Sequence, residues 1–151
     1  MIQGGLSVGS GNLTLQTIGA GNNLTLSTNL VAGATGTVTL ISAGTITQIA
    51  GTISGRSLTG SSSGGATMTD ANAVSTLAGF TNAGGGGFSF VDGQALTVNA
   101  AVVDGGGGIS LATNTGGMVL GASLTTTGGL TLSSAGIINQ TSGSLTAASF
   151  T

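Results

Sequence analysis

Aliphatic and hydroxyl-bearing residues alternate in short runs along the whole chain. Typical runs are Leu13-Thr14-Leu15, Val38-Thr39-Leu40 and Leu130-Thr131-Leu132. In an extended chain, alternate side chains point to opposite faces, so the aliphatic residues share one face and the hydroxyls the other. The pattern predicts short, half-buried β-strands. Helices are not expected, because each internal Gly costs a helix about 1 kcal/mol relative to Ala.

The segments between the runs are rich in Gly and Asn. Both residue types tolerate positive φ angles, so we expect them to form tight corners by adopting that backbone conformation.

The chain also contains a longer internal repeat. Residues 38–59 read VTLISAGTITQIAGTISGRSLT, residues 130–151 read LTLSSAGIINQTSGSLTAASFT, and the two match at ten of 22 positions at an offset of 92. The sequence therefore predicts one repeat segment over residues 1–151 with an internal repeat of about 92 residues. It stops in mid-repeat without a charged or proline-containing cap, so we expect either a fragment of a longer protein or a subunit that stacks end to end.

Open-ended repetition of short strands with small residues at the corners favours a solenoid. We predict an all-β fold, a right-handed parallel β-solenoid (β-helix) of about seven or eight coils, forming a rod about 35 Å long. An antiparallel sandwich is the alternative, because Asp92-Gly93 and Asp104-Gly105 resemble hairpin turns. Disorder is disfavoured, because Pro is absent, charge is 3% and aliphatic residues recur throughout.

Composition excludes several functions. Gly, Ser and Thr make up 74 of 151 residues, Pro, Cys, His, Trp, Tyr, Lys and Glu are absent, and the ionisable side chains are Arg56, Asp70, Asp92 and Asp104. One basic residue cannot neutralise a phosphate backbone, so we predict no nucleic-acid partner. Without His or Cys, the common metal sites and nucleophile pairs cannot form. We predict no enzyme activity, no catalytic, cofactor or metal site, and no ligand-binding residues that can be named.

Membrane insertion is not expected either, since no run of about 18 apolar residues exists. Met1-Ile2-Gln3 is followed by Gly instead of a charged and then apolar region, so no signal peptide is recognised.

Two tetraglycines, at residues 84–87 and 105–108, could suggest a phosphate-binding loop. Such a loop needs a Lys, so a flexible corner or a protruding loop is the better interpretation. Arg56 and the three Asp are expected at solvated surface or turn positions. Phe80, Phe88 and Phe90 bracket the first tetraglycine, and we expect them to pack under a loop that bulges from the shaft.

Four Thr-x-Thr pairs could form a binding face, because both hydroxyls of a pair point the same way from a strand. They are Thr37/Thr39, Thr45/Thr47, Thr67/Thr69 and Thr125/Thr127. Such pairs resemble the ice-binding face of some β-solenoid antifreeze proteins. The pairs follow one another at irregular intervals that fit no constant coil length, so outward residues that only form ladders are the expected interpretation.

Three acceptor sequons for N-glycosylation begin at Asn12, Asn23 and Asn139. Asn and Thr are so frequent in this chain that we expect these sequons to have arisen by chance.

The segments at residues 38–48 and Gln94-Ala95-Leu96-Thr97-Val98 resemble a known family. They are similar to the repeats of giant bacterial surface proteins related to filamentous haemagglutinin. The resemblance implies a right-handed β-helical shaft, a two-partner or autotransporter adhesin passenger, secretion to the outer cell surface, and a role in adhesion or biofilms. Host-cell or polysaccharide surfaces are the implied partners. The family's secretion-signal domain is not recognisable in this chain.

Three functional hypotheses follow. The first is a structural shaft segment of a secreted bacterial cell-surface adhesin or extracellular filament. The second is a self-assembling extracellular fibre subunit that stacks end to end, since alternating strands with low charge and no Pro favour stacking. The third is an ice- or polysaccharide-binding β-solenoid that uses a Thr-rich face.

Overall fold

The computed structural model describes residues 4–151 and contains only β-strands and their connections. The strands are β1 (Leu6–Ser7), β2 (Leu13–Gln16), β3 (Leu24–Leu26), β4 (Leu30–Val31), β5 (Thr37–Ser42), β6 (Ile46–Gln48), β7 (Ile53–Ser62), β8 (Ala66–Asn82), β9 (Phe88–Asp92), β10 (Leu96–Asp104), β11 (Ile109–Thr113), β12 (Met118–Leu120), β13 (Leu124–Thr126), β14 (Gly129–Ser134), β15 (Ile138–Gln140), β16 (Leu145–Thr146) and β17 (Ser149–Phe150). Residues 4–151 form no helix that could span a membrane.

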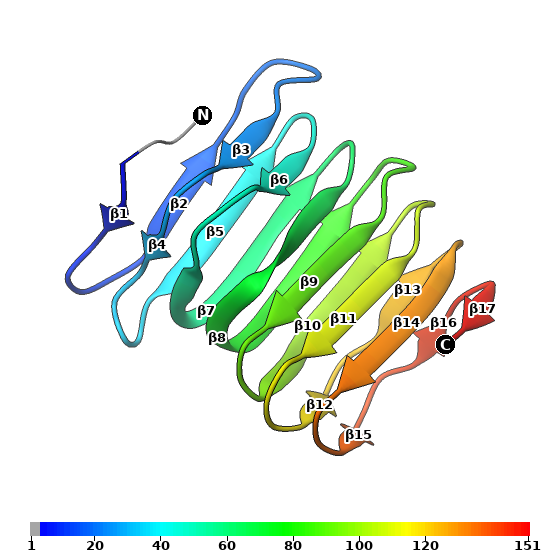
Figure 1. Cartoon of the computed structure of the whole chain (residues 1–151). Coiled ribbons are helices and arrows are strands. Elements are labelled where there is room, and N and C mark those ends of the chain that lie inside the picture. Colours follow the sequence, from blue (N-terminus) through cyan, green and yellow to red (C-terminus); the bar gives the residue numbers. More distant parts are fainter. Residues whose placement is uncertain (1–3) are drawn as a thin grey trace.

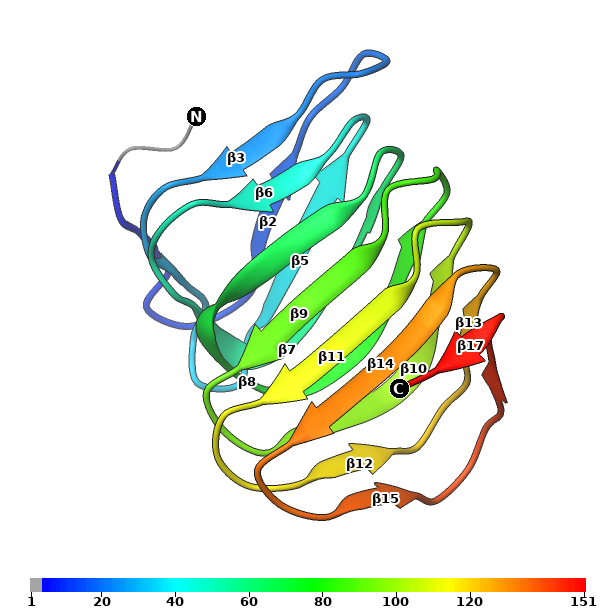
Figure 2. The same ribbon diagram turned by 45° about the vertical axis from the view of Figure 1, so that its right-hand side comes forward.

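The strands wind into about seven stacked coils, and every strand pairing within residues 4–151 is parallel (Figures 1 and 2). One side of the solenoid, which we call sheet A, contains β3, β6, β9, β11, β14 and β17 together with the start of β8. The other strands form sheet B, which wraps around the rest of the coil. β8 belongs to both, because it bends near Asn72 from one sheet into the other.

Equivalent residues stack in columns that run along the shaft. In sheet A, one column contains Leu24, Ile46, Ala66, Phe88, Ile109, Leu130 and Phe150, and each step between neighbouring members is the length of one coil. Such regular parallel stacking confirms the predicted parallel β-solenoid and its number of coils. The sandwich alternative is wrong, because Asp92-Gly93 and Asp104-Gly105 turn the corners of coils and do not join antiparallel strands.

The interior contains the aliphatic half of the alternating pattern and three aromatic rings. Phe80, Phe88 and Phe90 are all buried, and the Phe80 and Phe88 rings stack with their centroids 4.4 Å apart. Small residues make the space: Gly60 lies next to Phe80 in the adjacent coil, and Ala66 lies next to Phe88. The predicted bulging loop over these rings is therefore wrong, since they pack inside the shaft.

Corners are formed by two different devices. Among the described residues, positive φ angles occur only at Gly, for example at Gly51 and Gly108. The Asn corners work differently from our expectation. The side-chain oxygens of Asn12, Asn23 and Asn29 accept hydrogen bonds from backbone N–H groups of the next coil, at 2.8 to 2.9 Å.

Segments that lie 92 residues apart share their local structure, but they lie on different sides of the coil. Gly44 N–H donates to Ser42 Oγ at 3.2 Å, and Gly136 N–H donates to Ser134 Oγ at 3.3 Å. Yet the first copy begins in sheet B, where Val38 stacks on Leu58, and the second begins in sheet A, where Leu130 stacks on Phe150. Since 92 residues cover between four and five coils, the repeated segment lies on a different side each time.

Candidate functional site

The acidic side chains are the first features to test as a site, and two of them are buried. Asp92 is 0% exposed and Asp104 is 2% exposed, whereas Arg56 is exposed and Asp70 is half-buried. The prediction of solvated positions is therefore wrong for Asp92 and Asp104. They do lie at corners, but their carboxylates point inward.

Asp104 belongs to a column of polar side chains at one corner of the coils. This first corner column contains Ser42, Ser62, Asn82, Asp104 and Thr126. The Asp104 carboxylate accepts hydrogen bonds from Asn82 Nδ2 at 2.6 Å and from Thr126 Oγ1 at 2.9 Å. It also accepts two from the backbone N–H groups of Gly106, at 3.1 Å, and Gly108, at 2.7 Å.

These last two bonds explain the second tetraglycine. Residues 105–108 fold around the Asp104 carboxylate, so the chain's own side chain occupies the kind of backbone cradle that binds anions elsewhere. The first tetraglycine is organised similarly, since Asn82 Nδ2 donates to the carbonyls of Gly84 and Gly86. Both are tight corners stacked on each other, and the protruding-loop interpretation is wrong.

Asp92 belongs to a second corner column, which contains Asn72, Asp92, Thr113 and Ser134. Gln48 joins it from the adjacent coil, because its Nε2 donates to Asn72 Oδ1 at 2.8 Å. Its carboxylate accepts hydrogen bonds from the backbone N–H groups of Val74, at 3.0 Å, and Gln94, at 2.9 Å. Burial raises the pKa of Asp92 from 3.8 to about 6, although these two hydrogen bonds oppose the shift. Asp92 and Asp104 lie at different corners, so they do not form a carboxylate pair.

No three His, Cys, Asp or Glu side chains gather within residues 4–151 as a metal site would require. Every buried side-chain nitrogen or oxygen in that range also has a hydrogen-bond partner. The two corner columns are therefore structural networks that hold the coils in register.

The exterior of sheet A has a feature that the sequence analysis did not identify. Six hydroxyl residues lie in register on six successive coils and point outward; we call them the hydroxyl ladder. They are Thr25, Thr47, Thr67, Ser89, Ser110 and Thr131. Neighbouring members are separated by the strand spacing of about 4.8 Å.

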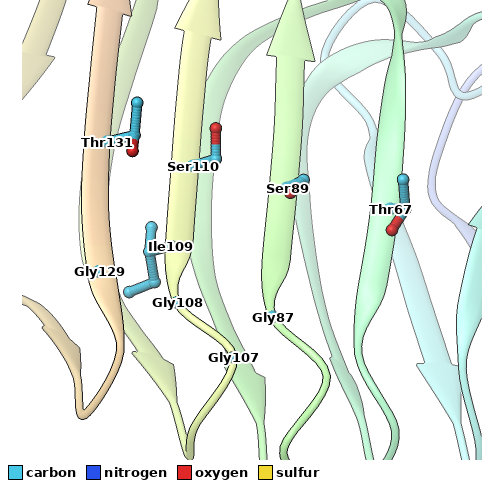
Figure 3. A pocket seen from close by; sticks show the side chains of 9 residues that line it. All are labelled: Thr67, Gly87, Ser89, Gly107, Gly108, Ile109, Ser110, Gly129 and Thr131. Carbon is cyan, nitrogen blue, oxygen red and sulfur yellow. The ribbon is translucent and has the colours of Figure 1, made fainter. Parts of the chain in front are cut away.

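A shallow groove of about 350 Å³ lies over the C-terminal part of this ladder (Figure 3). Its lining consists of Thr67, Gly87, Ser89, Gly107, Gly108, Ile109, Ser110, Gly129 and Thr131. The lining contains no charged side chain. Its hydroxyls can both donate and accept hydrogen bonds, which suits a neutral ligand surface that carries hydroxyls of its own.

The Thr-x-Thr pairs are divided between the two sheets. Thr47 and Thr67 belong to the hydroxyl ladder, whereas Thr39 and Thr125 lie on sheet B. The pairs therefore do not form one face. The ladder was missed because it contains both Thr and Ser, and because its members recur once per coil, a spacing that is visible only once the coil length is known.

The three sequon asparagines have different roles. Asn12 and Asn23 are exposed, but their side-chain oxygens bind the backbone N–H groups of Thr37 and Thr45. Asn139 is exposed on β15.

The fold and this face together define a parallel β-solenoid with a hydroxyl-bearing and almost uncharged exterior. No protein-family model matches the chain, and no curated protein or solved structure matches it either.

Proposed function

We propose that the chain is a structural shaft segment of a secreted bacterial cell-surface adhesin or extracellular filament. The observation that carries the proposal is the continuity of the columns: residues in register follow one another from Leu15 in β2 to Leu145 in β16 without interruption. A solenoid of this kind can be lengthened by adding coils, because each coil contacts only its neighbours. The adhesin and cell-surface parts of the proposal rest on the resemblance to haemagglutinin-like repeats.

Inserting a second copy of residues 38–129 after Gly129 tests the shaft. The new junction reproduces the match between residues 38–59 and 130–151. We expect a folded rod about 20 Å longer with an unchanged width, because 92 residues add four to five coils at about 4.8 Å each. Small-angle X-ray scattering measures both dimensions. A wider particle of unchanged length contradicts the shaft proposal.

The cellular part of the proposal has its own test. Antibodies raised against the purified chain should label intact cells of the organism that produces it, or the extracellular material around them. Labelling that requires permeabilised cells would overturn the surface location and leave the shaft itself in place.

The hydroxyl ladder supports a second candidate function, the binding of ice or of a polysaccharide. Both ligands present hydroxyl groups or water molecules at regular intervals, and a ladder with one hydroxyl per coil can meet them repeatedly.

Ser110→Lys places a charged side chain in the middle of the groove and is expected to lower binding at least tenfold. The matched control is Thr81→Lys, at an exposed position on sheet B. Thermal hysteresis tests ice, and co-sedimentation with insoluble polysaccharides tests the other ligand. If the wild-type chain is inactive in both assays, or if the two variants behave alike, the ladder is not a binding face.

A further inference from the structure

The groove on sheet A follows the hydroxyl ladder across four coils. Its ladder members are Thr67, Ser89, Ser110 and Thr131, which lie in a row across the strands (Figure 3). The two outer members are exposed threonines, whereas the two serines between them are half-buried. Ser lacks the methyl group of Thr, so the two middle positions leave space that Thr would fill. The groove is therefore a hollow in the ladder and not a flat face.

The hydroxyls in the groove are available to a ligand. Within residues 4–151, none of the four forms a hydrogen bond with another group of the chain. Exposed hydroxyls at the corners behave differently. Thr127 Oγ1 donates to the Gly105 carbonyl at 3.0 Å, and Thr115 Oγ1 donates to the Gly93 carbonyl at 2.7 Å. The groove thus presents a row of hydroxyls whose partners must come from outside the chain.

Bare backbone lies next to this row. The glycines that line the groove are Gly87, Gly107, Gly108 and Gly129. Because they carry no side chain, a ligand can approach their backbone closely. An ionic ligand would lose hydration here without gaining a charged partner, since the lining has none. The groove therefore suits a neutral ligand that carries hydroxyls.

The spacing of the ladder selects the shape of this ligand. Its hydroxyls repeat once per strand, at about 4.8 Å, so Thr67 and Thr131 are about 14 Å apart. An extended β-linked pyranose chain advances by nearly the same interval at each sugar. Successive sugars turn over, but each has hydroxyls on both edges, and the hydroxyls of Ser and Thr can both donate and accept. A chain that lies along the shaft presents one sugar to each ladder hydroxyl, whereas a coiled α-linked chain does not keep this register.

We propose that the groove binds one extended chain of a neutral β-linked polysaccharide, which lies along the shaft across β8, β9, β11 and β14. This inference rests on the second candidate function, the use of the hydroxyl ladder as a binding face. It selects the polysaccharide and adds the linkage and direction of the chain. Ice fits less well, because a flat ice surface rests on the outer threonines and does not fill the space above the two serines.

Two oligosaccharides of the same sugar test the fit. Cellohexaose is an extended β-linked chain of glucose, and maltohexaose is its coiled α-linked isomer. We expect the wild type to bind cellohexaose, and to bind maltohexaose about tenfold more weakly because the coiled chain reaches fewer ladder hydroxyls. Isothermal titration calorimetry measures both affinities.

A double variant fills the groove and keeps its hydroxyls. Ser89→Thr combined with Ser110→Thr adds two methyl groups to the floor and should weaken cellohexaose binding about tenfold. The matched control combines Ser57→Thr with Ser61→Thr, which adds the same groups to the outer face of sheet B and should bind like the wild type. Circular dichroism checks folding. Should the groove variant fail to fold, Ser110→Ala removes one hydroxyl and is expected to weaken binding about fivefold.

Several results would overturn the proposal. Equal affinity for the two oligosaccharides would, and so would no binding of cellohexaose at millimolar concentration or unchanged binding by the groove variant. Thermal hysteresis in both the wild type and the groove variant would assign the face to ice. That outcome rejects this inference but leaves the candidate function in place, and none of these results bears on the shaft function.

Discussion

Replacing Gly60 by Ala is expected to lower the free energy of unfolding by about 3 kcal/mol or more. A Cβ at this position would lie 2.0 Å from the backbone oxygen of Leu40 and 3.0 Å from the Phe80 ring. The Leu40 oxygen belongs to the neighbouring strand, so it cannot move without disturbing the pairing of β5 and β7. Phe80 cannot retreat either, because its ring stacks on Phe88.

Gly85→Ala is the matched control. A Cβ on Gly85 meets nothing within 4 Å, and this Gly has no positive φ. The control should therefore change stability by less than about 1 kcal/mol, and it could gain slightly from the reduced freedom of the unfolded chain. Urea unfolding followed by circular dichroism measures both variants. Equal midpoints for Gly60→Ala and Gly85→Ala would show that the Phe80 cluster can repack, against the prediction.

The stability of the wild-type chain should rise as the pH falls from about 7 to 4, because of Asp92. Burial raises the pKa of Asp92 in the folded chain from 3.8 to about 6. The unfolded chain keeps the ordinary value, so the folded chain binds the proton more tightly between these two pH values. Protonation therefore favours folding: the gain is absent above the folded pKa and complete below the unfolded one. It amounts to about 3 kcal/mol.

Asp92→Asn should remove this pH dependence. The variant is expected to gain stability relative to the wild type as the pH rises from 4 to 8, because an amide carries no charge. At pH 4 it should be less stable than the wild type, because its Nδ2 cannot accept the backbone N–H that one of the two carboxyl oxygens of Asp92 accepts. Asn72 shows that the corner accepts an amide: one coil away in the same column, its Oδ1 accepts the backbone N–H of Ile53 at 2.9 Å.

Denaturant titrations at several pH values measure this effect. The reciprocal variant Asn72→Asp places a second carboxylate in the column and should steepen the dependence on pH. A wild-type chain whose stability is constant or decreases between pH 7 and 4 would contradict the role given to Asp92.

The alternating pattern was enough to predict strands and corners, because each coil repeats the same choice between inside and outside. The predicted number of coils came from an assumed coil length. The same alternation contained information about the buried acids that the sequence analysis did not use. Phe88, Phe90 and Asp92 occupy every second position of β9, so the alternation that buries the two rings also directs the carboxylate inward. The charge of Asp92 led to the expectation of a solvated side chain, but its position in the alternating strand places it in the interior.

The hydroxyl ladder could not be predicted in the same way. Alternation shows that Ser89 and Ser110 point outward, but it does not show that they occupy equivalent positions on neighbouring coils. That depends on the length of each connection, and the steps along sheet A are not all equal. A change of one residue in a corner would exchange inward and outward positions in the following strand. The corner hydrogen bonds of Asn12, Asn23 and Asp104 fix these lengths, and they become visible only in three dimensions.

The shift of the repeated segment between sheets has a consequence for any longer array of such repeats. Because 92 residues do not complete a whole number of coils, a substitution made once per repeat would not produce a line along the rod. Val38 and Leu120 share a column, and Leu130 lies midway between Leu120 and the next member, Gln140, so the substitution would alternate between two sides of the rod. An array of this kind would display a single feature on both sheets, so that two sides of the rod could meet a neighbouring surface with it.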